Sequence, residues 1–289
     1  MRDKNKKTLT LSLGALGIVY GDLGTSPLYA LQQVLNKEVI TPDHVYGVLS
    51  LVFWSLILVI STGYVTVFLR ADNDGEGGIL SLLYLLRRQN KHFSRGLFLI
   101  GVVGAGLLLG DGMITPAISV ISAIEGLKVI SPNFSHLIMP ASFIILLVLF
   151  ICQHFGTAII SFIFGPIILI WFIIIAILGA VAIIHNPTIL QAVNPYYALI
   201  FLYYGGWHAY LLLGGVFLVV TGAEAMYADL GHFGKNPIRI GWFAVALPAL
   251  LLNYFGQGAN LLSHPEAISN VFYALAPSWF SYPLLFIAT

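Results

Sequence analysis

Long apolar runs separated by short polar connections dominate this chain, and their lengths predict its architecture. A helix needs about 20 mostly apolar residues to cross a bilayer. Seven runs have about this length, and an eighth begins near residue 279 and is still apolar at Thr289. We therefore expect membrane-spanning helices over residues 11–35, 45–69, 96–124, 137–153, 157–184, 207–229 and 240–261, with an eighth over 279–289 that stops before its end.

Two connections carry patterns of their own. Residues 70–95 contain a polar stretch followed by an amphipathic run at 79–88, which predicts a short helix lying along the membrane surface. Residues 188–206 are rich in tyrosine and broken by Asn194-Pro195, which is typical of an interfacial or re-entrant segment. Since the sequence stops inside the eighth run, we expect residues 1–289 to be the transport domain of a longer protein.

Composition and charge fit a membrane protein. Hydrophobic residues make up 58% of the chain and charged residues 9%, whereas soluble domains carry about 25% charged residues. Eleven of the thirteen basic residues precede span one or lie between spans two and three or after span six; Lys37 and Lys128 are the exceptions. The positive-inside rule then predicts a multi-pass protein of the cell membrane with a cytoplasmic N-terminus. Because the basic residues are scattered, no nucleic-acid partner is expected.

Three carboxylates lie deep inside predicted spans, namely Asp22, Asp111 and Glu224. An ionised aspartate at the centre of a membrane helix costs about 2.5–3.5 kcal/mol. A salt bridge could offset this cost, but no lysine or arginine lies inside any predicted span. A bound cation or a proton is therefore expected to neutralise these groups. A carboxyl group removed from water binds a proton more readily, so each is also a candidate proton carrier.

Hydroxyl groups accompany two of these carboxylates. Asp111, Thr115 and Ser119 are four and eight residues apart, which keeps them within about 80° on one helix face. The three would form a ladder of oxygen ligands. Alternatively, the hydroxyls bond back to carbonyls of their own helix. In span six, Thr221 and Glu224 are neighbours on one face at a spacing of three.

Spans one and six are both interrupted by glycine, polar and acidic residues. Span one contains "GIVYGDLGTSPLYA" over residues 17–30, and span six contains "TGAEAMYADLG" over residues 221–231. The two lie five spans apart, as a five-plus-five inverted repeat requires. Interrupted spans in corresponding positions indicate the substrate site of a transporter. Carboxylates at both breaks would repel an anion, so the expected substrate is a small cation with oxygen ligands.

Five blocks carry a resemblance to a known family. They are "GIVYGDLGTSPLYA", "DNDGEGGILSLLYLL", "LLGDGMITPAISVISAIEGL", "TGAEAMYADLGHFGKNPIRIGW" and "NYFGQGANLL". Together and in this order they resemble the Kup/HAK/KT potassium uptake permeases. The resemblance implies an all-α, leucine-transporter-like fold of the amino acid-polyamine-organocation superfamily with twelve spans. It also implies potassium uptake coupled to proton entry without a cofactor, and a soluble C-terminal domain through which the protein would form a homodimer in the lipid membrane.

The resemblance also implies roles for individual residues. Its motifs place potassium ligands at Asp22 and Tyr29 of span one, at Asp111, Thr115 and Ser119 of span three, and at Thr221 of span six. Glu224 matches the carboxylate implicated in proton coupling, which Asp111 and Asp22 would share. Some relatives have glutamate where Asp111 stands, so the charge is kept here on a shorter side chain.

Three alternatives belong to other classes. An intramembrane aspartyl protease would use Asp22, "LLGD" at 108–111 and "LPAL" at 247–250, but the first glycine of its Gly-x-Gly-Asp motif is Leu108 here. A potassium channel would need a filter of the TVGYG type, which the sequence lacks. An amino-acid transporter on the same fold would meet Asp22 where the substrate carboxylate docks.

Overall fold

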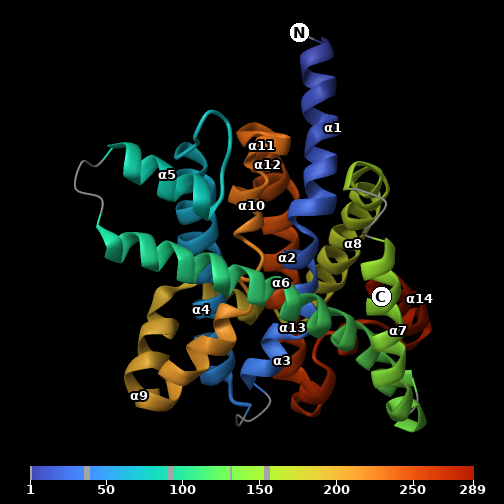
Figure 1. The fold of residues 1–289 in the computed structure, drawn as a ribbon. Coiled ribbons are helices and arrows are strands. Elements are labelled where there is room, and N and C mark those ends of the chain that lie inside the picture. Colours follow the sequence, from blue (N-terminus) through green and yellow to red (C-terminus); the bar gives the residue numbers. More distant parts are fainter. Residues whose placement is uncertain (1, 36–39, 90–93, 131, 153–156) are drawn as a thin grey trace.

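The computed structural model is all-helical and describes residues 2–35, 40–89, 94–130, 132–152 and 157–289 (Figure 1). The α-helices are α1 (Arg2–Val19), α2 (Gly21–Thr25), α3 (Ala30–Leu35), α4 (Pro42–Ser55), α5 (Ile79–Gln89), α6 (Arg95–Ile130), α7 (Ile138–Cys152), α8 (Thr157–His185), α9 (Pro195–Phe217), α10 (Ala225–Ala228), α11 (Leu230–Phe233), α12 (Lys235–Gly241), α13 (Leu247–Ser263) and α14 (Ser281–Ala288). Wider π-type turns extend α4 over Leu56–Val67 and join α12 to α13 over Trp242–Ala246. Single 3₁₀ segments cover Ser26–Leu28, Phe68–Arg70, Pro132–Leu137, Pro187–Val193, Pro265–Asn270, Tyr273–Leu275 and Ser278–Phe280.

Within these residues, six helices are long and apolar enough to cross a membrane. They are Pro42–Arg70, Arg95–Lys128, Asn133–Ile151, Phe164–His185, Pro195–Phe217 and Lys235–Ser263. Two shorter apolar helices, Thr8–Val19 and Ser278–Ala288, lie near the two ends of the chain. The predicted class, an all-α multi-pass membrane protein, is confirmed. The leucine-transporter-like fold and its inverted repeat remain predictions.

The first apolar run is not one helix. The backbone leaves helical geometry at Tyr20 (φ −106°, ψ 2°) and again at Tyr29 (φ −133°, ψ −29°). Between them lie the single turn of α2 and the 3₁₀ segment Ser26–Leu28. Glycine is a poor helix former, and Pro27 has no N–H to donate to the preceding turn. These residues account for the break.

The run before α10 is broken twice. Gly206 has a φ of 51° inside α9, which divides this helix into two parts. After Phe217, residues 218–224 form successive tight turns, and Gly222 has a φ of 89°. An L-residue with a side chain rarely adopts such angles, so both bends depend on glycine. The long helix therefore runs from Pro195 to Phe217, whereas the sequence predicts a span over 207–229.

The centre of the protein is formed by α1, α8 and α13. α13 packs along α8, which also contacts α1. A Cβ atom placed on Gly179 or Gly256 would overlap the backbone of the opposite helix, so α8 and α13 approach as closely as two helices can. Small residues permit such contacts between membrane helices. Trp171 of α8 and Tyr254 of α13 are buried beside the break in span one.

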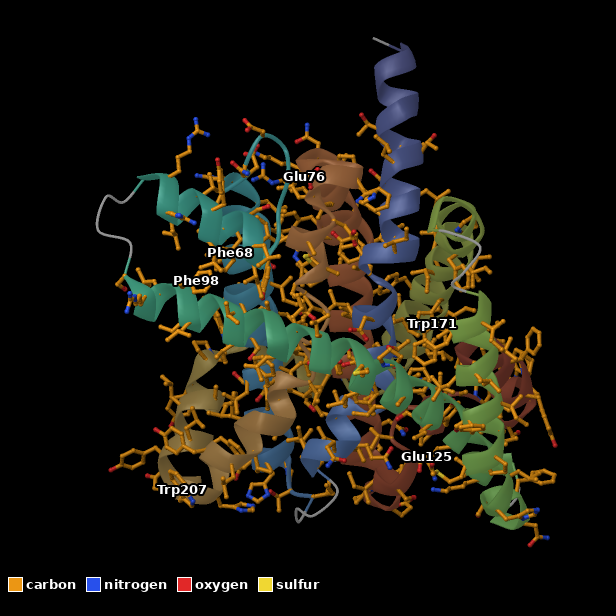
Figure 2. The ribbon with its side chains drawn as sticks, viewed as in Figure 1. Phe68, Glu76, Phe98, Glu125, Trp171 and Trp207 are labelled. Carbon is orange, nitrogen blue, oxygen red and sulfur yellow. The ribbon has the colours of Figure 1, made fainter. Side chains whose placement is uncertain are left out.

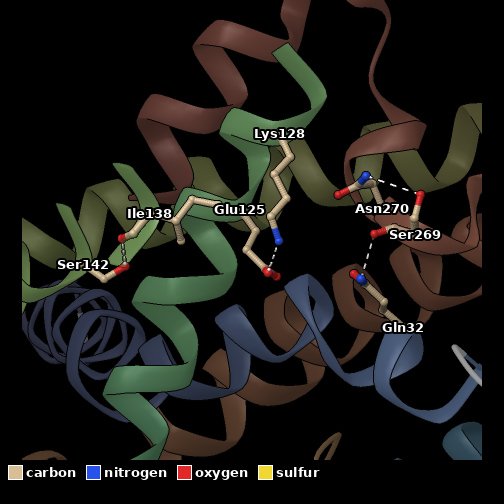
Figure 3. A network of polar contacts seen from close by, with 7 residues as sticks. All are labelled: Gln32, Glu125, Lys128, Ile138, Ser142, Ser269 and Asn270. Atoms are coloured by element: carbon tan, nitrogen blue, oxygen red, sulfur yellow. Dashed lines mark hydrogen bonds and ion pairs between the residues drawn. The ribbon is translucent and has the colours of Figure 1, made fainter. Parts of the chain in front are cut away.

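Two polar faces lie at opposite ends of the helices. The start of α1, α5, α11 and α12 lie together at the top of Figure 1, which we call the N-terminal face. Toward the opposite face, Lys128 is paired with Glu125 at 2.7 Å, and Gln32 donates to the carbonyl of Ser269 at 2.7 Å (Figure 3). The predicted surface helix at 79–88 corresponds to α5. Lys37 and Lys91, which enter the charge argument, lie outside the described residues.

Candidate cation site

Three carboxylates that are far apart in the sequence meet between the broken spans and α6. They belong to Asp22 of α2, Asp111 of α6 and Glu224, which directly precedes α10. One oxygen from each lies within 4.8 Å of the others, and all three side chains are partly buried. This group, called the carboxylate triad below, joins spans one, three and six at one point.

No basic side chain balances the triad within the part of the chain that the structure describes. The ion pairs found there join Lys128 to Glu125, Lys235 to Asp72, and His232 to Asp229. Two full charges 4.8 Å apart repel by about 3–4 kcal/mol at an effective dielectric constant of about 20. Three ionised carboxylates therefore need a cation or protons between them.

The break in span six faces the triad with its backbone. A Cβ atom on Gly222 would lie 2.7 Å from Oδ2 of Asp22, so glycine lets the two broken spans touch. A carboxylate oxygen of Glu224 lies within 4.8 Å of one of Asp111, and a hydrogen bond between two carboxyl groups requires a proton on one of them.

The hydroxyl ladder of span three is arranged around the triad. Thr115 donates from Oγ1 to Oδ1 of Asp111 at 2.9 Å. The Ser119 hydroxyl shares a hydrogen bond of 2.9 Å with that of Thr25, which also donates to the Asp22 carbonyl. Among the described residues, neither the Thr115 nor the Ser119 hydroxyl donates to a backbone carbonyl of α6, so both hydroxyl oxygens remain near the carboxylates. Thr25 stands in the quoted motif, but the sequence analysis gave it no role.

Tyr29 lies beside this ladder, whereas the Thr221 hydroxyl does not contact it. The Tyr29 side chain is close to Ser119 and to the carboxylates of Asp22 and Asp111. The Thr221 hydroxyl instead donates to the carbonyl of Phe217 at 3.4 Å, within its own segment. The structure therefore groups five of the predicted ligands with Glu224 and leaves the Thr221 hydroxyl outside.

Backbone carbonyls at the two breaks differ in how they are used. In span six, the carbonyls of Leu218, Val219 and Thr221 accept no backbone hydrogen bond from any described residue. In span one, side chains of other helices occupy the freed carbonyls. Trp171 donates to Gly24 at 2.7 Å, and Gln257 donates to Pro27 at 2.9 Å. The break in span six is thus the better source of carbonyl ligands.

The sequence analysis missed this support for span one. Gln257 also donates to Oδ1 of Asn253 at 2.7 Å, and Asn253 donates to the carbonyl of Ile175 on α8. Both amides are fully buried in α13. Two amides four residues apart in an apolar span were a visible signal, because buried amides need partners.

We predict that Gln257→Leu destabilises the protein. The substitution leaves two buried acceptors, on Pro27 and Asn253, without their donor. Each unsatisfied buried group costs about 1–3 kcal/mol. The midpoint of thermal unfolding in detergent is therefore expected to fall by several degrees. Gln32→Leu is the matched control, since Gln32 donates one bond at an exposed position, and it should leave the midpoint nearly unchanged. Equal midpoints for both variants would contradict the structural role of Gln257.

Comparison with known proteins identifies the family. The sequence profile of the K+ potassium transporter integral membrane domain matches residues 9–289. The chain belongs to the potassium transporter family. Its relatives include the probable potassium transport system protein Kup 1 of Legionella pneumophila (strain Corby), 57% identical over 286 residues, which are 99% of this chain and 45% of the relative. The probable potassium transport system protein Kup of Methylibium petroleiphilum is 51% identical over 98% of this chain and 46% of its own length.

The family assignment has two consequences. The chain spans about half the length of the curated relatives it matches. The members of the potassium transporter family found here are transport proteins rather than enzymes, so the aspartyl protease alternative is wrong. No solved structure matches the chain.

Proposed function

We propose that the protein containing this chain takes up potassium across the cell membrane together with protons, by alternating access to the carboxylate triad. The observation that carries the proposal is the meeting of Asp22, Asp111 and Glu224 without a basic partner, at the breaks of two spans. The names of the curated relatives support potassium as the cation. An anionic substrate such as an amino acid would be repelled by the same charges.

In this proposal, potassium binds between the two breaks and α6. Asp22 and Asp111 supply charge, Tyr29 and the hydroxyls of Thr115 and Ser119 supply neutral oxygens, and Thr221 contributes its free backbone carbonyl. Carbonyl and hydroxyl oxygens can replace the hydration shell of potassium, as carbonyl rings do in channel filters. The Thr115 hydroxyl donates its proton to Asp111, so its oxygen can face a cation.

Proton coupling follows from the number of charges. One potassium ion cannot neutralise three carboxylates, so at least one proton must accompany it into the triad. Glu224 is our candidate because its carboxylate lies within 4.8 Å of those of Asp22 and Asp111, and because the family resemblance places the coupled proton there. Groups this close exchange protons as a coupled set rather than singly. Loading of potassium at Asp22 and of a proton at Glu224 would then depend on each other.

We predict that Glu224→Gln removes the pH dependence of uptake. A proton-coupled transporter takes up more potassium as the external pH falls, because protonation of the triad precedes loading. Glutamine keeps the shape of protonated glutamate but cannot release a proton. The initial rate of rubidium uptake, measured between pH 5.5 and 8, should therefore become flat. Asp229→Asn, a change at a carboxylate outside the triad, should keep the wild-type slope. A wild-type slope in Glu224→Gln would remove Glu224 from the coupling step.

Orientation and surroundings complete the proposal. We place the N-terminal face in the cytoplasm, because the basic residues of α5 and α12 lie on it. The exposed apolar side chains of α6 and α7 would contact membrane lipid or further spans. Pairing through a C-terminal domain concerns residues beyond this chain and stays a prediction.

The proposal is tested with the full-length protein in cells that lack other potassium uptake systems. The protein should restore growth at low potassium, and potassium should compete with rubidium uptake while amino acids should not. Uptake should also stop when the proton gradient is dissipated. Competition by an amino acid would favour the amino-acid transporter alternative. A rubidium flux that depends on the rubidium gradient but not on the proton gradient would favour a channel.

A further inference from the structure

A cavity of about 130 Å³ lies between Glu224 and α5, the surface helix of the N-terminal face. Its walls are Tyr64 and Phe68 at the end of span two, Ile79 and Leu82 of α5, and Leu108 of α6, with Tyr227 and Ala228 beside Glu224. Glu224 is the only ionisable carboxylate among these lining residues and also belongs to the triad. Figure 2 shows Phe68 next to α5. The cavity therefore begins at the proposed site and ends beneath the surface helix.

One wall of the cavity, α5, is connected to span two through a short segment, residues 71–78, that we call the strap. The strap joins span two to α5 and lies beside α11, where a Cβ atom on Gly231 would be 2.8 Å from the carboxylate of Glu76 (Figure 2). It is attached to the inner part of span six at three points. The Tyr227 hydroxyl donates to the Ala71 carbonyl, Asp72 forms an ion pair with Lys235, and Gly77 lies against the Tyr227 carbonyl.

These attachments are specific but weak. The Lys235 ammonium group holds the pKa of Asp72 below its usual range, so the pair is ionised at neutral pH. Both side chains are partly exposed to solvent, so water screens the pair and its contribution to stability is small. A segment held by a few exposed polar contacts opens more easily than the packed helices around it. Since Tyr227 and Lys235 flank α10 and α11, a shift of the inner part of span six would pull the strap with it.

The cavity as it stands is too apolar for a hydrated cation. Leucine, isoleucine and phenylalanine side chains form most of its lining, and hydrophobic constrictions block ions by excluding water. Ions can pass only if one wall moves outward. α6 is a continuous helix of 36 residues, whereas α5 is short and connected through the strap. We therefore expect α5 to be the wall that moves outward.

We propose that this cavity is the cytoplasmic exit of the carboxylate triad, and that the strap with α5 forms its gate, latched by the Asp72–Lys235 pair. The inference rests on the proposed transport function and adds the route and the moving part. It assigns Ile79 and Leu82 to the exit lining and Asp72 and Lys235 to the latch.

The route is tested by cysteine modification in the full-length protein from which other cysteines have been removed. Ile79→Cys and Leu82→Cys line the cavity, while Leu80→Cys lies on the same helix, is 69% exposed and does not line it. A charged, membrane-impermeant methanethiosulfonate reagent is added to the cytoplasmic side of inside-out vesicles. Modification at the two lining positions should reduce rubidium transport at least fivefold. Added potassium should slow the modification reaction itself. Leu80→Cys should keep its transport.

Two results would overturn the route. One is unchanged transport after complete modification of the lining cysteines; the other is equal loss at all three positions. Failure of the proposed function would differ from both, because the unmodified cysteine variants would then show no rubidium transport that potassium inhibits. The two hypotheses are therefore separable in one set of vesicles.

The latch is tested by the rate of modification at Leu82→Cys. Asp72→Asn and Lys235→Gln should each speed the reaction about two- to fivefold, which corresponds to loss of a partly exposed ion pair. The exchanged pair, Asp72→Lys with Lys235→Asp, should restore the slow rate, and rubidium transport by each variant before modification shows that it still folds. Unchanged rates in both single variants, or a fast rate in the exchanged pair, would exclude the ion pair as the latch.

Discussion

Replacing Asp22 with asparagine should abolish potassium uptake at low external potassium while leaving the protein folded. Asp22 is the triad member that lies in the break of span one and touches the break of span six at Gly222. Asparagine keeps the size of the side chain and one carbonyl oxygen but removes the charge. A charged contact to a bound ion contributes about 2–3 kcal/mol, so affinity for rubidium should fall roughly 30- to 150-fold.

The control and the fold check for this prediction come from the same region. Asp229→Asn removes a carboxylate that pairs with His232 outside the triad, and it should transport rubidium at nearly the wild-type rate. Asp22→Asn should show the wild-type unfolding midpoint or a higher one, because removing one of three crowded charges relieves repulsion. Uptake by Asp22→Asn with wild-type affinity would show that potassium binds elsewhere.

The sequence predicted the parts of the site that depend on local signals. Carboxylates in apolar runs stand out because each is costly in a membrane, and helical spacing alone placed Asp111 beside Thr115. The structure adds the hydrogen bond between these two residues. That Asp22, Asp111 and Glu224 meet at one point was expected from the broken spans, and in the described structure the three lie together.

The rest of the site depends on packing between distant segments, which a single sequence does not reveal. Trp171 and Gln257 lie more than 140 and 220 residues from the carbonyls to which they donate, so the sequence does not reveal their partners even where the amides of α13 stand out. At Thr221 the structure adds a detail that helical spacing does not show. Its spacing from Glu224 is helical, but the backbone there is unwound, so its hydroxyl bonds to Phe217 instead.

The predicted spans and the observed helices differ at the bends of the backbone. Apolar length identifies a run, but it does not say where the run bends. Gly206, with a positive φ, divides Pro195–Phe217 into two helical parts, and Gly222, also with a positive φ, lies in the unwound residues 218–224. The run at 11–35 is likewise divided after Val19, so its longest apolar helix is Thr8–Val19. Both differences occur where the carboxylates lie, because a site of this kind requires backbone that has left the helix.

Gly222→Ala should remove transport almost as completely as Asp22→Asn, through geometry rather than charge. The φ of 89° at Gly222 costs an alanine about 1–2 kcal/mol. The new methyl group would also lie 2.7 Å from Oδ2 and 2.8 Å from Cβ of Asp22, which is closer than such atoms can approach. Asp22 or the unwound segment must therefore move away, and the triad would open.

This displacement gives Gly222→Ala a signature that a general loss of stability would lack. Rubidium uptake should fall more than tenfold, and potassium should lose its protection of the protein against thermal unfolding. Gly214→Ala is the matched control, because Gly214 lies in regular helix on the same span with nothing within 4 Å of an added Cβ, so both uptake and protection should persist.

Removing the side chain of Asp22 provides the decisive measurement. In Asp22→Gly with Gly222→Ala, both the carboxylate and the Cβ atom that clash with the new methyl group are gone, so the unfolding midpoint should lie above the value expected from the sum of the two single changes while uptake stays absent. A double variant as unstable as the sum of its parts would mean that the two breaks do not touch.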